Sequence, residues 1–271
     1  MPQKELQKNF SGEFNKLLNK LKKGENFAFS RFSDGELFML QGKKVVLAKD
    51  YYITGDEKGQ GIYPEEEQKN FDPEEHEFHR DRLIEAFQFR KKNYFKGVSG
   101  KVDVGEKDFK WQLNLYGHGD REHLTFSNVF INNNYPRFLN EFVPLLKKRP
   151  IIFVVNKKAD LSKLLFNDFD IVKDFRIGSN CIVNDYHLVE EIKSYIKDNN
   201  IKDHIILCSA SALSNYIVHQ CYDDCDKNTY IDIGSSLSPW LGLDGWKYSR
   251  AYLQHWVLGM ENQYGTKVDV W

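Results

Sequence analysis

The chain has 271 residues, of which 41% are hydrophobic and 28% charged, and its formal net charge at pH 7 is −1. This composition excludes a disordered chain, a collagen-like repeat and a surface that is basic throughout. The strongest apolar run, Ile151 to Val155, is far shorter than the about 20 residues that a membrane-spanning helix needs. The four cysteines are too few for a disulfide scaffold and favour a reducing compartment. We therefore expect one cytoplasmic domain over residues 1–271, with no secretory signal, membrane span or nucleic-acid partner.

The N-terminal part predicts a helix, a strand and a polar turn. Apolar residues recur at three- and four-residue steps over residues 3–23, which indicates an amphipathic helix. Aromatic residues alternate along Phe27–Phe32, which indicates a short strand. This strand runs into the polar turn Ser33–Glu36, after which a new helix is expected.

The next segment has a different composition. Residues 51–73 contain three glycines, two prolines and three consecutive glutamates, so we expect a long surface loop there. Such a loop either closes over a ligand or is only a solvated connection. A helix over residues 74–92 and a strand over 94–99 should follow, and the polar segment up to Leu124 shows no clear pattern.

The second half alternates apolar strands with short amphipathic helices. This alternation predicts an α/β fold with a Rossmann-like, mostly parallel sheet and helices on both faces. The aromatic-rich region 240–271 ends the chain, and its rings suit either an acceptor sugar or core and interface packing. The expected strands are 151–155, 169–177, 204–208 and 229–233, and the expected helices are 159–166, 185–197 and 210–221.

Ligands of parallel sheets bind at the carboxyl ends of the strands. Polar residues follow four of the expected strands. We therefore expect the functional site to be drawn from the segments Ser30–Glu36, Asn156–Ala159, Ser209–Ser211 and Asp232–Ser236.

The turn after the first strand carries the clearest chemical pattern. Asp34 and Glu36 offer the carboxylate oxygens that Mg²⁺ or Mn²⁺ takes together with substrate phosphates. Gly35 would let the chain turn tightly and a ligand approach the backbone, and Arg31 could pair with a phosphate. The alternative is that Asp34 caps a helix and Glu36 occupies its first turn, where acids are favoured without any ligand.

The segment F-S-R-F-S-D-G-E-L, which begins at Phe29, resembles the opening motif of the GT-D type glycosyltransferases. That family includes a glucosyltransferase domain that extends sugars on bacterial serine-rich adhesins. It has a Rossmann-like sheet and uses a nucleotide-diphosphate sugar with a divalent metal at a D-x-E motif. The resemblance implies that Asp34 and Glu36 bind the metal. It also implies a donor pocket shaped by Arg31, Gly35 and Ser33, the last of which stands where the family has glycine.

A second region is similar to the closing strand–turn–helix–strand of the same family. It runs I-I-L-C-S-A-S-A-L-S-N-Y-I from Ile205 and ends with T-Y-I-D-I-G-S from Thr229. The resemblance implies that Ser209 and Ser211 lie near the nucleotide and that Asp232 belongs to the D-I-G step. Looser donor-binding candidates in the same layout are Asn128 and Asn156.

The catalytic base does not follow from the resemblance. Family members have acidic residues shortly after D-I-G, whereas this chain continues S-S-L-S-P-W from Ser235. Asp232 and Asp120 are our candidates, and Asp244 and Glu122 are alternatives. An inverting transfer needs a base near the acceptor hydroxyl, so the stereochemical outcome also stays open.

The resemblance, together with the paired carboxylates, implies a metal-dependent glycosyltransferase. It would move a sugar from a nucleotide-diphosphate donor, most simply a UDP-sugar, to a saccharide or glycosylated acceptor, with Mn²⁺ or Mg²⁺ as cofactor. One alternative is a non-catalytic nucleotide- or saccharide-binding module on the same fold. Another is a metal-dependent phosphohydrolase built around the D-G-E turn. The oligomeric state stays open, and a homo-oligomer is one of the alternatives.

Overall fold

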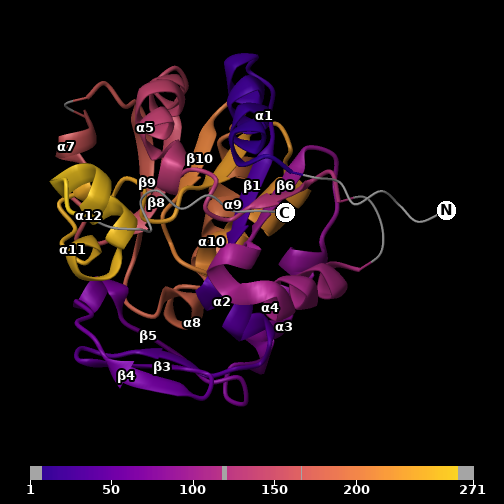
Figure 1. Cartoon of the computed structure of the whole chain (residues 1–271). Coiled ribbons are helices and arrows are strands. Elements are labelled where there is room, and N and C mark those ends of the chain that lie inside the picture. The colour runs from indigo at the N-terminus through magenta and orange to yellow at the C-terminus, as the bar shows by residue number, and fades with distance from the viewer. Residues whose placement is uncertain (1–7, 118–120, 166, 262–271) are drawn as a thin grey trace.

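A computed structural model describes residues 8–117, 121–165 and 167–261 (Figure 1). Its centre is a seven-stranded sheet in the order β7-β6-β1-β11-β10-β8-β9. Every neighbouring pair in this sheet is parallel, so the expected α/β fold class is confirmed. The strands are β1 (Ala28–Phe32), β6 (Tyr94–Val98), β7 (Leu124–Phe126), β8 (Ile151–Asn156), β9 (Ile171–Ile177), β10 (Ile205–Cys208) and β11 (Thr229–Asp232).

Helices cover both faces of this sheet. Successive side chains of each strand enter two separate hydrophobic clusters, as Ile206 and Cys208 do on one face and Ile205 and Leu207 on the other. The first face packs against α3 (Glu77–Gln88), α4 (Lys101–Tyr116), α9 (Leu188–Asp198) and α10 (Leu213–Asp224). The second packs against α1 (Phe10–Lys22), α5 (Tyr135–Arg137), the π-helix η3 (Phe138–Phe142), α6 (Val143–Leu146) and α12 (Ala251–Leu258).

Shorter helices occupy the connections between these elements. None of the helices in the described part of the chain is both long and apolar enough to cross a membrane. These short helices are α2 (Asp34–Leu40), α7 (Ser162–Leu165), α8 (Cys181–Asn184), α11 (Trp246–Ser249), η2 (Asn132–Asn134) and η4 (Ser238–Trp240).

The first helix is shorter than the sequence pattern predicts. Within the described residues α1 begins at Phe10, because Asn9 acts as its N-cap and accepts a hydrogen bond from Gly12 N at 2.9 Å. Lys8 and Asn9 precede the helix, so its expected extent over residues 3–23 is wrong at this end. Residues 1–7 lie outside the described part of the chain.

The expected irregular loop over residues 51–73 is wrong. This segment contains three of the four strands of a small antiparallel sheet, in the order β4-β3-β2-β5. A two-residue turn with Gly55 at φ 65° joins β3 to β4. The sequence pattern missed these strands because β3 and β4 have no buried side-chain face and so no apolar alternation. The elements are β2 (Val45–Leu47), β3 (Tyr51–Thr54), β4 (Glu57–Gln60), the 3-10 helix η1 (Glu65–Glu67) and β5 (Lys69–Phe71).

The small sheet lies against the loops at the carboxyl ends of the parallel strands (Figure 1). Asn180, after β9, donates its backbone N–H to Gln68 O at 3.0 Å. Lys158, after β8, forms an ion pair with Glu65 at 2.8 Å. We call residues 45–71, from β2 to β5, the insert. These polar contacts bring the insert to the edge of the sheet where ligands are expected.

A lysine is buried inside the parallel sheet. Lys96 in β6 is 1% exposed, and its ammonium group donates to the carbonyl of Phe89 and lies over the rings of Tyr94 and Tyr116. Burial, with a smaller contribution from the charge of Arg90, lowers the pKa of Lys96 to about 7. Between about pH 7 and the ordinary lysine value of 10.5, the folded state therefore binds fewer protons than the unfolded state. In that range this residue makes the free energy of unfolding rise with pH.

We expect Lys96→Met to stabilise the fold relative to wild type most strongly near or below about pH 7, because methionine removes the cost of burying a charge. The advantage should shrink toward about pH 10, where the wild-type lysine is neutral in the folded state. Urea unfolding across this pH range measures the difference. Lys110→Met, at an exposed position of α4, is the matched control and should show no such trend. An advantage that grows as pH rises would contradict the assignment.

Candidate active site

The strand order makes the carboxyl ends of the strands beside β1 the expected ligand position. From β1 the chain proceeds outward through β6 and β7 on one side, whereas β11 and β10 lie on the other. Crevices at such reversals of strand order are the usual ligand sites of open parallel sheets. The residues that follow β1, β10 and β11 all lie at this edge, as their parallel pairing requires.

Asp232 ends β11 at this carboxyl edge and is 4% exposed. Its Oδ2 accepts a hydrogen bond from Arg31 N at 3.3 Å, and its Oδ1 accepts one from Gly234 N at 2.9 Å. Burial raises the pKa of Asp232 to about 7, although the positive charge of Arg31 opposes the shift, and the negative charge of Glu36 adds to it. The site therefore holds a carboxyl group that changes charge near neutral pH.

Arg31 lies over the turn that follows Asp232. Its Nε donates to Ser127 O, after β7, at 2.6 Å, and its guanidinium covers Gly234. Gly234 has φ 51°, and a Cβ there would come within 1.6 Å of Arg31 Nη1. Asn215 of α10 fixes the strand beneath, since its Nδ2 donates to Arg31 O at 2.6 Å. Glycine is thus required at this point of the D-I-G step.

The D-G-E turn forms the first turn of α2. Ser33 is the N-cap residue, and its N–H and Oγ both donate to Glu36 Oε2, at 3.1 and 2.5 Å. Asp34 is exposed and accepts a hydrogen bond from Gly35 N at 2.9 Å. The expectation that Asp34 is the cap is therefore wrong, because Ser33 holds that position. The first-turn placement expected for Glu36 in that alternative is confirmed.

Gly35 does not make the tight turn that the sequence pattern suggests. It lies within α2, its φ is not in the left-handed region, and an added Cβ would have no atom within 4 Å. The expected conformational reason for this glycine is therefore wrong. The free space around its Cα still leaves room for a ligand.

The carboxylates of Asp34 and Glu36 were the predicted metal ligands. Within the described residues, no group of three or more His, Cys, Asp or Glu side chains could hold a metal ion. Asp34 is exposed, and Glu36 is 6% exposed with one oxygen bound to Ser33. Two carboxylates suit Mg²⁺ or Mn²⁺ that takes its remaining ligands from water and substrate phosphates, and they do not suit an all-protein cage. Asp34 and Glu36 therefore fit a metal that is also held by water and substrate phosphates.

Of the looser donor-binding candidates, Ser209 lies closest to the turn after β11. Its Oγ donates to Gly234 O at 2.7 Å. Ser211 has φ 47° and accepts a hydrogen bond from Lys69 Nζ of the small sheet at 3.2 Å. The structure thus brings Ser209 to the D-I-G turn and Ser211 to the edge of the insert.

The two asparagine candidates have different surroundings. Asn128 follows Ser127 and donates to Asp103 Oδ2 at 3.0 Å, and its buried Oδ1 has no hydrogen-bond partner within the described residues. Asn156 instead closes the turn after β8, where its Oδ1 accepts from Lys158 N at 2.9 Å. Asn156 therefore has a local structural role. Asp120 lies outside the described residues.

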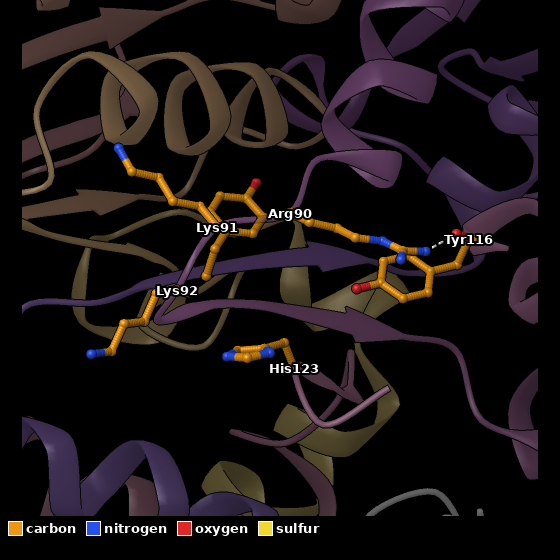
Figure 2. Close-up of a pocket in the computed structure, with 6 residues that line it drawn as sticks. Arg90, Lys91, Lys92, Tyr116 and His123 are labelled. Atoms are coloured by element: carbon orange, nitrogen blue, oxygen red, sulfur yellow. Dashed lines mark hydrogen bonds between the residues drawn. The ribbon is translucent and has the colours of Figure 1, made fainter. Parts of the chain in front are cut away.

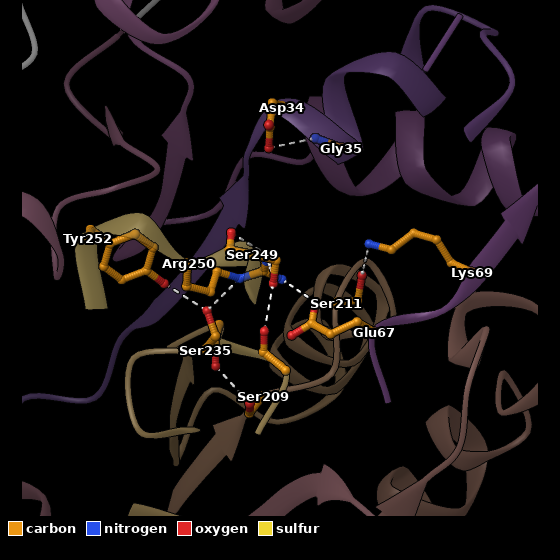
Figure 3. A network of polar contacts seen from close by, with 12 residues as sticks. Asp34, Gly35, Glu67, Lys69, Ser209, Ser211, Ser235, Ser249, Arg250 and Tyr252 are labelled. Atoms are coloured by element: carbon orange, nitrogen blue, oxygen red, sulfur yellow. Dashed lines mark hydrogen bonds and ion pairs between the residues drawn. The ribbon is translucent and has the colours of Figure 1, made fainter. Parts of the chain in front are cut away.

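The sequence analysis missed Arg250. Its guanidinium donates from Nε to Ser235 Oγ at 3.1 Å and from Nη2 to Glu67 Oε2 of η1 at 2.6 Å (Figure 3). Tyr252 shares a hydrogen bond with the same Ser235 Oγ at 2.7 Å. Arg250 follows α11 in the aromatic-rich region, and nothing in the local sequence indicates that it returns to the D-I-G turn.

A pocket of about 250 Å³ lies elsewhere, near the amino ends of β6 and β7 (Figure 2). Tyr94 begins β6 and His123 precedes β7, so this pocket is at the edge of the sheet opposite to the D-G-E and D-I-G turns. Arg90 Nη2 donates to Tyr116 O at 2.6 Å on its wall. The remaining lining residues are Lys91 and Lys92.

Two solved structures share the fold. One is described as a new glycosyltransferase (DUF1792) from Streptococcus sanguinis. It aligns at a TM-score of 0.55 and 17% sequence identity over 86% of this chain and 82% of its own. The other is a selenomethionine-substituted structure of domain of unknown function 1792, with a TM-score of 0.53 and 14% identity over 86% and 79%. No family model matches the sequence, and no curated protein matches it. The resemblance noted in the sequence is thus confirmed at the level of the fold.

We expect Gly234→Ala to destabilise the protein by about 1 kcal/mol or more, because the new Cβ meets both an unfavourable φ and the Arg31 guanidinium. Gly35→Ala is the matched control and should leave the free energy of unfolding unchanged or raised, because its Cβ has space and alanine favours a helix. Urea unfolding of both variants measures the contrast. Equal effects would contradict the assigned geometry.

We expect Asp232→Asn to become more stable relative to wild type as pH rises from about 4 to about 7. The folded carboxyl group keeps its proton above its unfolded pKa, so the wild type loses stability over this range and the variant does not. The difference should be on the order of a few kcal/mol. Thermal unfolding at several pH values measures it, and the exposed Asp198→Asn in α9 serves as the control. A difference that does not change with pH would show that the carboxyl group is not perturbed.

Proposed function

We propose that the protein is a metal-dependent glycosyltransferase that transfers a sugar from a nucleotide-diphosphate donor, a UDP-sugar, to a saccharide or glycosylated acceptor. One observation carries the proposal: the D-G-E turn and the D-I-G turn meet at the carboxyl edge of β1 and β11, with Arg31 bonded across them. The fold is that of a solved structure described as a glycosyltransferase, which supports the same activity.

In this proposal Asp34 and Glu36 hold Mn²⁺ or Mg²⁺ together with the donor diphosphate. The metal, when bound, neutralises charge on the leaving diphosphate. Ser33 fixes the orientation of the Glu36 carboxylate through two hydrogen bonds. Arg31 offers guanidinium N–H groups to a phosphate oxygen, and Ser127 O holds its Nε side in place.

We propose Asp232 as the catalytic base. A carboxyl group with a pKa near 7 is suited to accept a proton from an acceptor hydroxyl at neutral pH. The hydrogen bonds from Arg31 N and Gly234 N keep it in one orientation.

Two other functions lead to different results in the same assay. A non-catalytic nucleotide-binding module would bind UDP and leave UDP-sugars intact. A phosphohydrolase would release inorganic phosphate without any sugar acceptor. The absence of acidic residues directly after D-I-G favours the binding module over the phosphohydrolase as the second candidate.

We expect calorimetric titration to show UDP binding in the presence of Mn²⁺ and a loss of about tenfold or more in affinity with EDTA. Asp34→Asn and Glu36→Gln, which keep the shape of each side chain and remove its charge, should each weaken the metal-dependent part. Glu190→Gln, an exposed acid of α9, is the control and should bind as wild type does. Hydrolysis of a panel of UDP-sugars then separates the enzyme from the binding module.

Two results would contradict the proposal. If UDP affinity is the same with EDTA and in both variants, Asp34 and Glu36 are structural residues of the α2 N-terminus. If neither UDP nor any other nucleotide binds to the folded protein, the glycosyltransferase assignment fails.

A further inference from the structure

We propose that Arg250 is a second diphosphate-binding residue of the donor site. When no donor is bound, the carboxylate of Glu67 occupies the position that a donor phosphate would take at Arg250. This inference rests on the proposed function and identifies residues of the same site that its motifs do not contain. It predicts that donor binding exchanges one anionic partner of Arg250 for another.

The position of Arg250 is set by the D-I-G turn. Arg31 lies over Gly234, and Arg250 Nε donates to the next residue, Ser235, at 3.1 Å. Two guanidinium groups, one from β1 and one from the C-terminal region, therefore lie on consecutive residues of one turn. An anion bound at this turn would meet both of them, and a diphosphate has enough oxygens for two forked partners.

The charges around Arg250 belong to the same site. Burial opposes its charge, but Glu67, together with smaller contributions from Tyr252 and Asp34, more than offsets this and holds the pKa of Arg250 above its usual value. Asp34 is the exposed acid of the D-G-E turn. Arg250 thus lies within electrostatic reach of the residue proposed to hold the metal.

Arg250 has capacity for a further acceptor. Its hydrogen bonds run from Nε to Ser235, from Nη1 to Ser249 O and Oγ, and from Nη2 to Glu67. A guanidinium has five N–H hydrogens, so one on Nη2 has no acceptor among these contacts. The side chain is 29% exposed, which leaves it open to a ligand.

Glu67 is suited to be replaced. It is carried by η1 of the insert, and its carboxylate contacts Arg250 Nη2 at 2.6 Å. A phosphate oxygen would need the same N–H group, so the two anions compete and a bound donor displaces Glu67. Lys69, two residues further on, contacts Ser211 Oγ and has no carboxylate within 4 Å in the described structure, so the insert also brings a positive charge to this edge.

The test is calorimetric titration of UDP and of inorganic pyrophosphate into wild type, Arg250→Gln, Arg250→Lys and Glu67→Gln. We expect Arg250→Gln to lower the affinity for both ligands about tenfold or more. Arg250→Lys should restore only part of the lost affinity, because lysine keeps the charge and lacks the forked donors of a guanidinium. Glu67→Gln should bind both ligands more tightly, by about threefold or more, because the competing anion is removed. Its melting temperature should fall slightly, because an ion pair is lost.

If Glu67→Gln raises the ligand affinity and lowers the melting temperature, Glu67 competes with the ligand for Arg250. A purely structural ion pair would lower the melting temperature without raising the affinity. The matched control is the pair Arg137–Glu141, which joins at 2.6 Å and whose arginine is about as exposed as Arg250. Arg137→Gln and Glu141→Gln should leave UDP and pyrophosphate affinity unchanged. Tighter binding in those variants would mean that the loss of any surface charge pair has this effect.

The outcomes separate the inference from the proposed function. If wild type binds UDP and Arg250→Gln binds it equally well, the role of Arg250 is overturned and the proposed function stands. If Glu67→Gln weakens binding, the exchange is overturned. If wild type binds pyrophosphate through Arg250 but no nucleotide, the proposed function is overturned and Arg250 remains a phosphate ligand. If wild type binds neither ligand, both are overturned.

Discussion

The buried carboxyl group of Asp232 is the constraint around which the site is organised. A carboxylate without water must be hydrogen-bonded or protonated. Here the chain bends back through Gly234 to bring a backbone N–H to one oxygen, and β1 supplies another N–H from Arg31. That bend requires a residue with a positive φ. The absence of a side chain at Gly234 also leaves the space that the Arg31 guanidinium fills. The arginine then reaches the end of β7. One satisfied acid thus fixes the relative positions of three strand ends.

The parallel sheet could be predicted from sequence because its strands are buried on both faces and appear as continuous apolar runs. Ile151–Val155 is an example, since all five residues are fully enclosed. The small sheet could not be predicted in the same way. Its strands β3 and β4 have no buried residue, and they pair with each other through a two-residue turn. The helix α4 was missed because Gly105, at φ 78°, interrupts its periodicity.

The residues of the candidate site also fall into two groups: those that a short sequence motif identifies and those that only the fold brings together. The D-G-E and D-I-G turns are short strings next to predictable strands, so their residues could be identified in advance. Their two glycines look alike in sequence, yet only Gly234 has a conformation that needs glycine. Arg250 and Glu67 are 183 positions apart, and no local pattern links them. Only the folded chain shows that both reach the turn after β11, because the insert and the C-terminal helices cover the same edge.

The insert that carries Glu67 leaves the main fold after α2 and rejoins it at α3, two helices that pack against each other. Its described ties to the carboxyl edge are largely ion pairs and hydrogen bonds. The insert contributes Val45 and Phe71 to the hydrophobic core on one face of the parallel sheet, whereas residues 47–70 include no buried residue. The stretch between these two residues therefore contributes little to the hydrophobic cores. Substitutions in residues 51–69 can therefore alter the surface that faces the carboxyl ends of the parallel strands at little cost to the hydrophobic cores.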